Sequence, residues 1–161
     1  MGVISEEMIK ELIGYAKEAR LKAYAPYSKY KVGAAALGSD GKIYTGCNIE
    51  NASFGLTNCA ERTAMFKAVS EGEREFVSIA IVGGMSETIN DFCAPCGVCR
   101  QVMSEFCTPD FRVILGDGEG DTDDVAIHQR LDGGIVLCRQ SLGAFQHGIL
   151  HQDANIRHIN G

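Results

Sequence analysis

The run FVSIAIV at positions 76–82 decides how the rest of the chain is interpreted. It is almost entirely apolar and rich in β-branched residues, with a single serine in the middle. A continuous run of this kind is typical of a strand that is buried on both faces of a sheet. We therefore expect residues 76–82 to form a central strand covered on both sides.

Helical patterns lie on either side of this strand. Residues 59–71 favour a helix that Asn58 or Thr57 could cap and that Gly72 could end. Residues 96–106 favour a second helix, because Pro95 stands where such a helix would begin. Residues 111–115 then have the pattern of another strand.

The residues before position 50 predict a helix and a hairpin. Apolar residues recur at helical spacing over residues 5–23, and Ser5 can cap that helix. Strands are expected at 31–37 and 43–47, joined at the turn signal Ser-Asp-Gly-Lys at 39–42. A hairpin followed by alternating helices and strands predicts an α/β fold, a three-layer α/β/α sandwich around a mixed β-sheet.

Length and charge narrow the class of protein. The chain has 161 residues and a formal net charge of −6, and we expect residues 1–161 to form a single domain. An acidic balance argues against a nucleic-acid partner held through its phosphates. The first ten residues lack the pattern of a signal peptide, and no apolar run reaches the ~18 residues that would span a membrane. We expect a cytoplasmic protein with reduced cysteines.

The segment from about 117 to 161 is atypical in composition. All lysines and glutamates lie at or before Glu119, whereas all four histidines lie after it. Residues 134–138 could form a strand, but helical periodicity is weak. We hypothesise that this segment has a different origin or constraint from the body, for example through a frame change in the coding sequence.

Three of the seven cysteines fall at predicted helix starts. Cys59-Ala60-Glu61 opens one helix, and Pro95-Cys96-Gly97-Val98-Cys99 opens the next. The unpaired N–H groups and the dipole at a helix start favour thiolates. Three thiolates with an open fourth position describe a catalytic zinc site, beside which Glu61 could move a proton. Arg62 and Arg100, next to ligands in sequence, could offset the negative charge.

Other interpretations of these cysteines remain open. Cys93 could close a four-thiolate structural zinc site, or join an iron–sulfur cluster with Cys96, Cys99 and Cys107, although the last spacing is longer than the common bacterial pattern. Cys93 is otherwise interpreted as a loop thiol near the site, and the cysteines at 47, 107 and 138 as small buried apolar residues. A metal site at His147 and His151 is a weaker alternative.

The sequence resembles the cytidine deaminase family. The resemblance rests on Cys-Ala-Glu at 59–61 and Pro-Cys-x-x-Cys at 95–99, a signature known for zinc deaminases. It extends from about Tyr24 to Leu115 and includes Tyr-Ala-Pro-Tyr-Ser at 24–28 and Gly-Cys-Asn-Ile-Glu-Asn at 46–51. Together the motifs look like those of the small free-nucleoside enzymes of the three-cysteine type, which are typically homotetramers with shared sites.

The resemblance assigns roles to individual residues. It implies that Cys59, Cys96 and Cys99 bind one zinc ion per subunit and that Glu61 is the proton shuttle. It implies that Asn48 and Glu50 hold the ribose 3′-hydroxyl. Further substrate contacts are implied for Tyr30, Ala60 and, through a partly kept aromatic motif, Phe145. Arg62 and Gln101 match residues that support the metal ligands. Tyr30 stands where the family commonly has Phe.

The activity that the resemblance implies is hydrolytic deamination of cytidine and 2′-deoxycytidine to uridine and 2′-deoxyuridine, with release of ammonia, as in pyrimidine salvage. The partner is then a small nucleoside, with no nucleic acid and no membrane involved. Two alternatives stay open: a deaminase of another cytosine nucleoside such as blasticidin S, and a non-catalytic structural zinc module.

Overall fold

The computed structural model describes residues 4–85, 89, 92–117, 122–126, 130–131 and 135–136. Its main sheet has five strands in the order β2-β1-β3-β4-β5. β3 pairs antiparallel with β1 and parallel with β4, so the sheet is mixed as predicted. The bounds of these strands are β1 Lys31–Gly38, β2 Ile43–Cys47, β3 Phe76–Gly84, β4 Arg112–Gly116 and β5 Thr122–Ala126.

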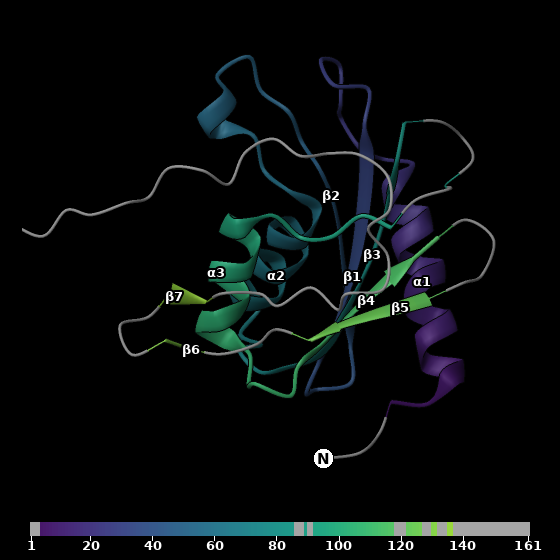
Figure 1. Ribbon diagram of the computed structural model, residues 1–161, viewed down its shortest axis with the longest axis vertical. Coiled ribbons are helices and arrows are strands. Elements are labelled where there is room, and N and C mark those ends of the chain that lie inside the picture. Colours follow the sequence, from purple (N-terminus) through teal and green to yellow (C-terminus); the bar gives the residue numbers. More distant parts are fainter. Residues whose placement is uncertain are drawn as a thin grey trace, which may run out of the picture.

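Helices cover both faces of the sheet, which confirms the three-layer prediction (Figure 1). One face carries α1 (Glu6–Arg20), and the other carries α2 (Ala60–Ser70) and α3 (Gly97–Phe106). The short helix η1 (Phe54–Leu56) precedes α2, and two short strands, β6 (Arg130–Leu131) and β7 (Ile135–Val136), pair with each other. Of these additional elements, only the region of β7 was predicted as strand.

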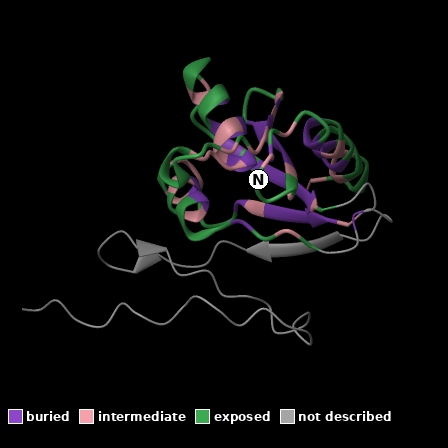
Figure 2. Ribbon diagram, turned by 90° about the horizontal axis from the view of Figure 1, so that it is seen from above, coloured by how far each residue is buried: buried purple, intermediate pink, exposed green. Residues whose placement is uncertain are grey.

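Successive residues of the central strand alternate between two apolar cores, as the pleat requires. Ile79 and Ile81 pack toward α2 and α3, whereas Ala80 and Val82 pack toward α1. Figure 2 shows the buried strands between helices whose outer surfaces are exposed. The uninterrupted apolar run thus follows from helices on both sides of β3.

Two glycines let the helices approach the sheet closely from opposite sides. A Cβ on Gly33 of β1 would lie 2.0 Å from the carbonyl oxygen of Ala16 in α1. A Cβ on Gly46 of β2 would lie 2.4 Å from the carbonyl oxygen of Ala60 in α2. Because real Cβ atoms are never found so close to backbone, both positions require glycine.

The start of α1 and the end of α2 agree with prediction, whereas α1 ends at Arg20 rather than at residue 23. The Ser5 hydroxyl accepts a hydrogen bond from the Met8 N–H at 3.2 Å, and Gly72 follows α2 with φ 102°. The expected cap of α2 at Asn58 or Thr57 is wrong, because Cys59 occupies that position. Asn58 instead pairs through its N–H and carbonyl with Ile49, so its backbone belongs to a β-bridge.

Six of the cysteines lie in the described residues, and all six are free thiols. None of the helices in this part of the chain combines the length and apolar character needed to cross a bilayer. The four histidines, Cys138 and Phe145 lie outside the described residues. Most of the predicted atypical segment 117–161 does so too.

Candidate metal and substrate site

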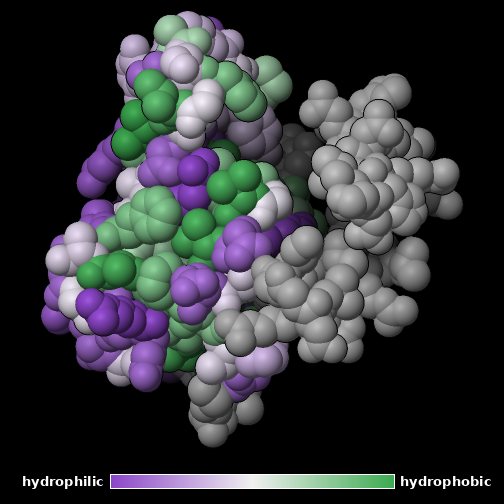
Figure 3. Space-filling model, turned by 90° about the vertical axis from the view of Figure 1, so that its left-hand side faces the viewer, coloured by the Kyte–Doolittle hydropathy of each residue, from purple (hydrophilic) through white to green (hydrophobic). Residues whose placement is uncertain are grey.

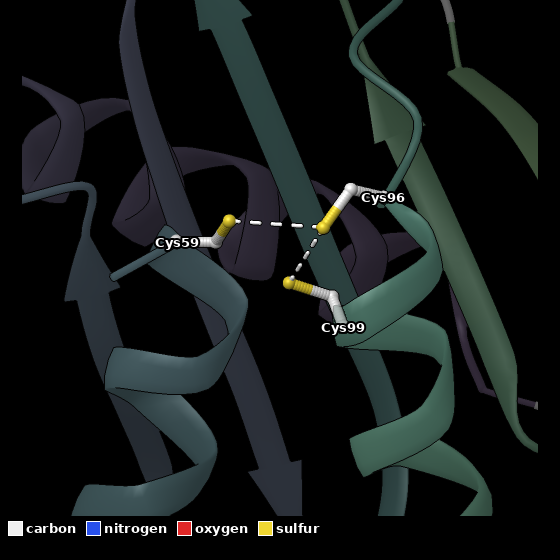
Figure 4. A group of neighbouring side chains, drawn as sticks. All are labelled: Cys59, Cys96 and Cys99. Atoms are coloured by element: carbon white, nitrogen blue, oxygen red, sulfur yellow. Dashed lines mark hydrogen bonds between the residues drawn. The ribbon is translucent and has the colours of Figure 1, made fainter. Parts of the chain in front are cut away.

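Two helix starts bring three thiols together. Cys59 is the N-cap residue of α2, Cys96 is the N-cap residue of α3, and Cys99 lies in the first turn of α3. The Cys96 sulfur is 3.8 Å from that of Cys59 and 3.6 Å from that of Cys99 (Figure 4). Cys99 is buried and Cys96 is exposed, so the group lies where the core meets the surface.

The sulfur spacing fits a zinc ion. All three sulfur atoms lie within 4.8 Å of one another. Zinc–sulfur bonds of about 2.3 Å in a tetrahedral arrangement place neighbouring sulfurs roughly 3.8 Å apart. The side chains are therefore arranged for one tetrahedral ion with three protein ligands. Among the described residues, Cys93 and Cys107 are outside this group, which gives no support to a four-thiolate site or an iron–sulfur cluster.

The electrostatics of the group favour negative charge on Cys96. Its thiol pKa is well below the ordinary value because of thiol–thiol hydrogen bonds with Cys59 and Cys99, aided by the backbone N–H groups of Cys99 and Val98. The contact with Cys96 raises the pKa of Cys59, and the contacts with Cys59 and Cys96 raise that of Cys99, since a second thiolate would face the first. A dication would remove this conflict between the three sulfurs.

Arg62 lies beside these sulfurs as the sequence predicts. Its Nη2 donates to the Cys59 sulfur at 3.5 Å and to the Thr57 carbonyl at 3.2 Å. Hydrogen bonds to Cys59 and Cys99 raise the pKa of Arg62. The Arg100 Nε donates to the Pro95 carbonyl at 2.7 Å and so holds the turn before α3, whereas its role in offsetting the thiolate charge stays a prediction.

Glu61 is buried next to the thiols. It is only 4% exposed and stands in the first turn of α2. Burial raises the pKa of its carboxyl, and the nearby Cys96 contributes in the same direction. A side-chain contact with Cys99 acts in the opposite direction. A carboxyl with a raised pKa beside a metal site can both accept and return a proton near neutral pH.

Asn48 and Glu50 are held by the loop that precedes β1 and by the start of β1 itself. The Asn48 side chain accepts from the Val32 N–H at 2.8 Å and donates to the Tyr30 carbonyl at 2.8 Å. One Glu50 oxygen accepts from the N–H groups of Tyr27 and Ser28, and the Ser28 hydroxyl donates to the other. Each side chain keeps one further N–H or lone pair for a ligand.

The remaining predicted residues, Tyr30, Ala60 and Gln101, have three different surroundings. Tyr30 is half-buried and interacts with the Cys93 side chain close to the thiol group. The Ala60 side chain is fully buried in the core, which leaves only its backbone to meet a ligand. Gln101 is exposed on α3, and its side chain makes no hydrogen bond within the described residues, so its supporting role stays a prediction. Sequence reasoning missed the part played by Ser28, although its motif was noted.

Comparisons with known proteins identify the class to which this site belongs. A family model described as the cytidine and deoxycytidylate deaminase zinc-binding region matches residues 6–115. The chain therefore belongs to this family of zinc-binding deaminases.

The chain is also similar to individual proteins that are named as cytidine deaminases. The chain is 52% identical over 129 residues to a cytidine deaminase of Halalkalibacterium halodurans, a match that covers 80% of this chain and 92% of the relative. It is 42% identical to a probable cytidine deaminase of Dictyostelium discoideum, over 81% of this chain and 85% of the relative. A crystal structure of cytidine deaminase from Burkholderia pseudomallei superimposes with a TM-score of 0.66 at 49% identity, covering 76% of this chain and 93% of that one.

Proposed function

We propose that this protein is a zinc-dependent enzyme that hydrolyses cytidine and 2′-deoxycytidine to uridine and 2′-deoxyuridine, releasing ammonia. The observation that carries the proposal is the three-thiol group with the buried Glu61 carboxyl beside it. The relatives named as cytidine deaminases support the choice of substrate. This activity belongs to the salvage of pyrimidine nucleosides.

Cys59, Cys96 and Cys99 are proposed to hold one zinc ion per subunit. When bound, the ion supplies a water molecule whose pKa is lowered to about 7. The hydrogen bond from Arg62 to Cys59 supports a role for this arginine in offsetting the thiolate charge. The exposed side of the group at Cys96 leaves room for a substrate to approach.

Glu61 is the proposed proton carrier. Its carboxylate takes a proton from the attacking water and delivers it to N3 of the cytosine ring. The same carboxyl then assists the amine at C4 to leave as ammonia. Burial supports this assignment because it raises the pKa of Glu61, which favours a carboxyl that can hold a proton between the two transfers.

Substrate contacts are proposed for the residues around the rim of the site. Asn48 and Glu50 hold the 3′-hydroxyl of the sugar, and Tyr30 lies beside the base. Ala60 contributes through its backbone at the start of α2. Phe145, which lies outside the described residues, is proposed to contact the substrate of a neighbouring subunit.

A homotetramer is proposed for the assembly. Aromatic and aliphatic side chains are exposed in the segments that surround the site, where Phe54 is 91% exposed and Leu56 is 71% exposed. Tyr24, Tyr27 and Ile49 are also exposed, and the bridges between Tyr24, Ile49 and Asn58 join these segments. On the face seen in Figure 3, apolar side chains reach the surface among polar ones. Large exposed apolar side chains in segments that are joined in this way favour association between copies.

Three further properties are proposed from the sequence. The net charge of −6 argues for a free nucleoside and against nucleic acid as the substrate. The free thiols support a reducing, cytoplasmic location. Residues 1–161 are proposed to form one domain, with an atypical segment from about 117.

An absorbance assay tests the proposed activity. Protein of known zinc content and known mass in solution is incubated with cytidine and 2′-deoxycytidine. The expected result is conversion of both nucleosides at a rate proportional to bound zinc, by a species of four subunits. Zinc-loaded protein that leaves cytidine unchanged would contradict the proposed function, and competition with blasticidin S would identify a different preferred nucleoside.

A further inference from the structure

The carboxylate of Glu50 has more partners than the sequence predicts. It accepts hydrogen bonds from two successive backbone N–H groups, that of Tyr27 at 2.9 Å and that of Ser28 at 3.2 Å. The hydroxyl of Ser28 donates to its other oxygen. These bonds, with that of the hydroxyl first among them, lower the pKa of Glu50. Glu50 is therefore an ionised acceptor in a fixed orientation.

The same hydroxyl has a second partner on the side of Tyr30. It accepts a hydrogen bond from the Tyr30 N–H at 3.0 Å. Since a carboxylate only accepts and an amide N–H only donates, the direction of both bonds is determined. Lys29, between these residues, has φ 61°, which turns the chain back so that the Tyr30 N–H meets the Ser28 oxygen.

Tyr30 is also held on its other sides. Its carbonyl accepts from Asn48, the second residue of the proposed sugar contact. A Cβ on Gly83 would lie 3.1 Å from a carbon of the Tyr30 ring and 2.8 Å from the Cys93 sulfur. Tyr30 and Cys93 thus pack together over Gly83. Cys93 lies three residues before Cys96 in the sequence. The ring of Tyr30 lies between the loop of Glu50 and the loop of the metal ligands.

We propose that Ser28 is a positioning residue that couples contact with the sugar at Glu50 to the placement of Tyr30 beside the base. The inference rests on the proposed function, in which Glu50 accepts from the 3′-hydroxyl. Without the Ser28 hydroxyl, the carboxylate loses the donor that orients one oxygen, and the Tyr30 N–H loses its acceptor. The sugar and the base would then be bound independently of each other.

Comparing cytidine with 3′-deoxycytidine, which lacks the 3′-hydroxyl, distinguishes this coupling from a general loss of structure in the variant. kcat and KM are measured for cytidine and for 3′-deoxycytidine with the wild type, Ser28→Ala, Ser28→Thr and Ser70→Ala. Ser70 is the matched control, because it is an exposed serine whose hydroxyl bonds to the Lys67 carbonyl at the far end of α2. The melting temperature of each variant reports whether the fold is kept.

The expected loss in kcat/KM for cytidine is about tenfold in Ser28→Ala, since a hydrogen bond to a charged group is removed. For 3′-deoxycytidine the expected loss is smaller, about threefold, because the contact with Glu50 is already missing and only the placement of Tyr30 is affected. Ser28→Thr restores most of the activity, and Ser70→Ala changes neither substrate. Equal losses with both substrates, or none with either, overturn the proposal.

Calorimetric binding of the products distinguishes this failure from a failure of the proposed function. Uridine and 3′-deoxyuridine are titrated into zinc-loaded wild type and Ser28→Ala, which needs no turnover. If the wild type binds uridine but does not deaminate cytidine, the proposed activity fails while the coupling is still measured from the ratio of the dissociation constants. If the wild type binds both nucleosides equally or neither, the coupling is overturned as well.

Discussion

The N-cap residues of α1, α2 and α3 have the same backbone conformation but different side chains. Ser5, Cys59 and Cys96 all have extended backbone at the N-cap position, with ψ of 153°, 156° and 166°. The Ser5 hydroxyl accepts from a backbone N–H, whereas neither cysteine makes a side-chain cap bond. The sulfurs point toward each other instead (Figure 4).

The hydroxyl and the thiols at these N-cap positions have different effects, the first on helix stability and the second on metal binding. A hydroxyl at the N-cap stabilises its helix by about 1 kcal/mol because it satisfies an unpaired donor. A thiol is a weak acceptor, so the N–H groups and the helix dipole remain available to stabilise negative sulfur. The N-cap serine of α1 therefore stabilises its helix, whereas the N-cap cysteines of α2 and α3 leave their sulfurs able to bind a cation.

Replacing one thiol is expected to have the largest effect. Cys96→Ser removes the sulfur that bonds to both others, so the protein should lose zinc and its cytidine turnover should fall by several orders of magnitude. Zinc content is measured by elemental analysis and turnover by absorbance. Cys93→Ser, outside the three-thiol group, is the matched control and should keep its zinc. An equal loss of zinc in both variants would contradict the three-ligand assignment.

The next largest effect is expected at Glu61. Glu61→Gln keeps the shape of the side chain but cannot carry the proton, so kcat should fall roughly 10²–10⁴-fold while zinc content stays unchanged. Glu71→Gln, at the other end of α2 and exposed, should leave kcat unchanged. Undiminished turnover in Glu61→Gln would remove this residue from the mechanism.

Substitution of Gly33 and of Gly46 should have different effects on turnover, because these glycines pack against helices on opposite faces of the sheet. In Gly33→Ala and Gly46→Ala the added methyl group collides with the backbone of the helix that packs there. Each substitution should lower the free energy of unfolding by about 1–3 kcal/mol. Only Gly46→Ala displaces α2, which carries Cys59, so it alone should also lower the turnover of the folded, zinc-loaded protein. Urea unfolding and turnover per bound zinc measure the two effects. Equal turnover in both variants would show that the site tolerates movement of α2.

The cap of α1 should matter for stability alone. Ser5→Ala removes the acceptor of the Met8 N–H and should lower the free energy of unfolding by about 1 kcal/mol. Urea unfolding measures the loss, and cytidine turnover at 25 °C should not change. A fall in turnover per folded molecule would mean that α1 contributes to the site.

The smallest expected effect has the opposite sign. In the absence of metal, Cys96→Ser places a good cap at the start of α3, so this variant should be more stable than metal-free wild type by about 0.5–1 kcal/mol. Both proteins are unfolded with urea in the presence of a chelator. A less stable metal-free variant would show that the thiol contacts stabilise the fold without an ion.

Residue patterns located the main elements because periodicity is a local property. The strand at 43–47 has the predicted bounds, and β1 and β3 each begin at the predicted residue. The sequence places the cap of α2 at Asn58 or Thr57, because both have side chains that commonly cap helices, whereas the N-cap residue is Cys59. Packing decided between them, since the backbone of Asn58 pairs with Ile49 and the helix must lie against Gly46.

The sequence by itself determined the chemistry of the site. Cys96 and Cys99 are three residues apart and share one helical turn, because side chains three or four residues apart share a helix face. Glu61 lies two residues after Cys59, in the first turn of α2. Only the tertiary structure decided that Cys59 meets Cys96 across 37 positions and that Ser28 joins Glu50 to Tyr30. Those contacts depend on how helices and loops pack on both faces of β3, which no local pattern encodes.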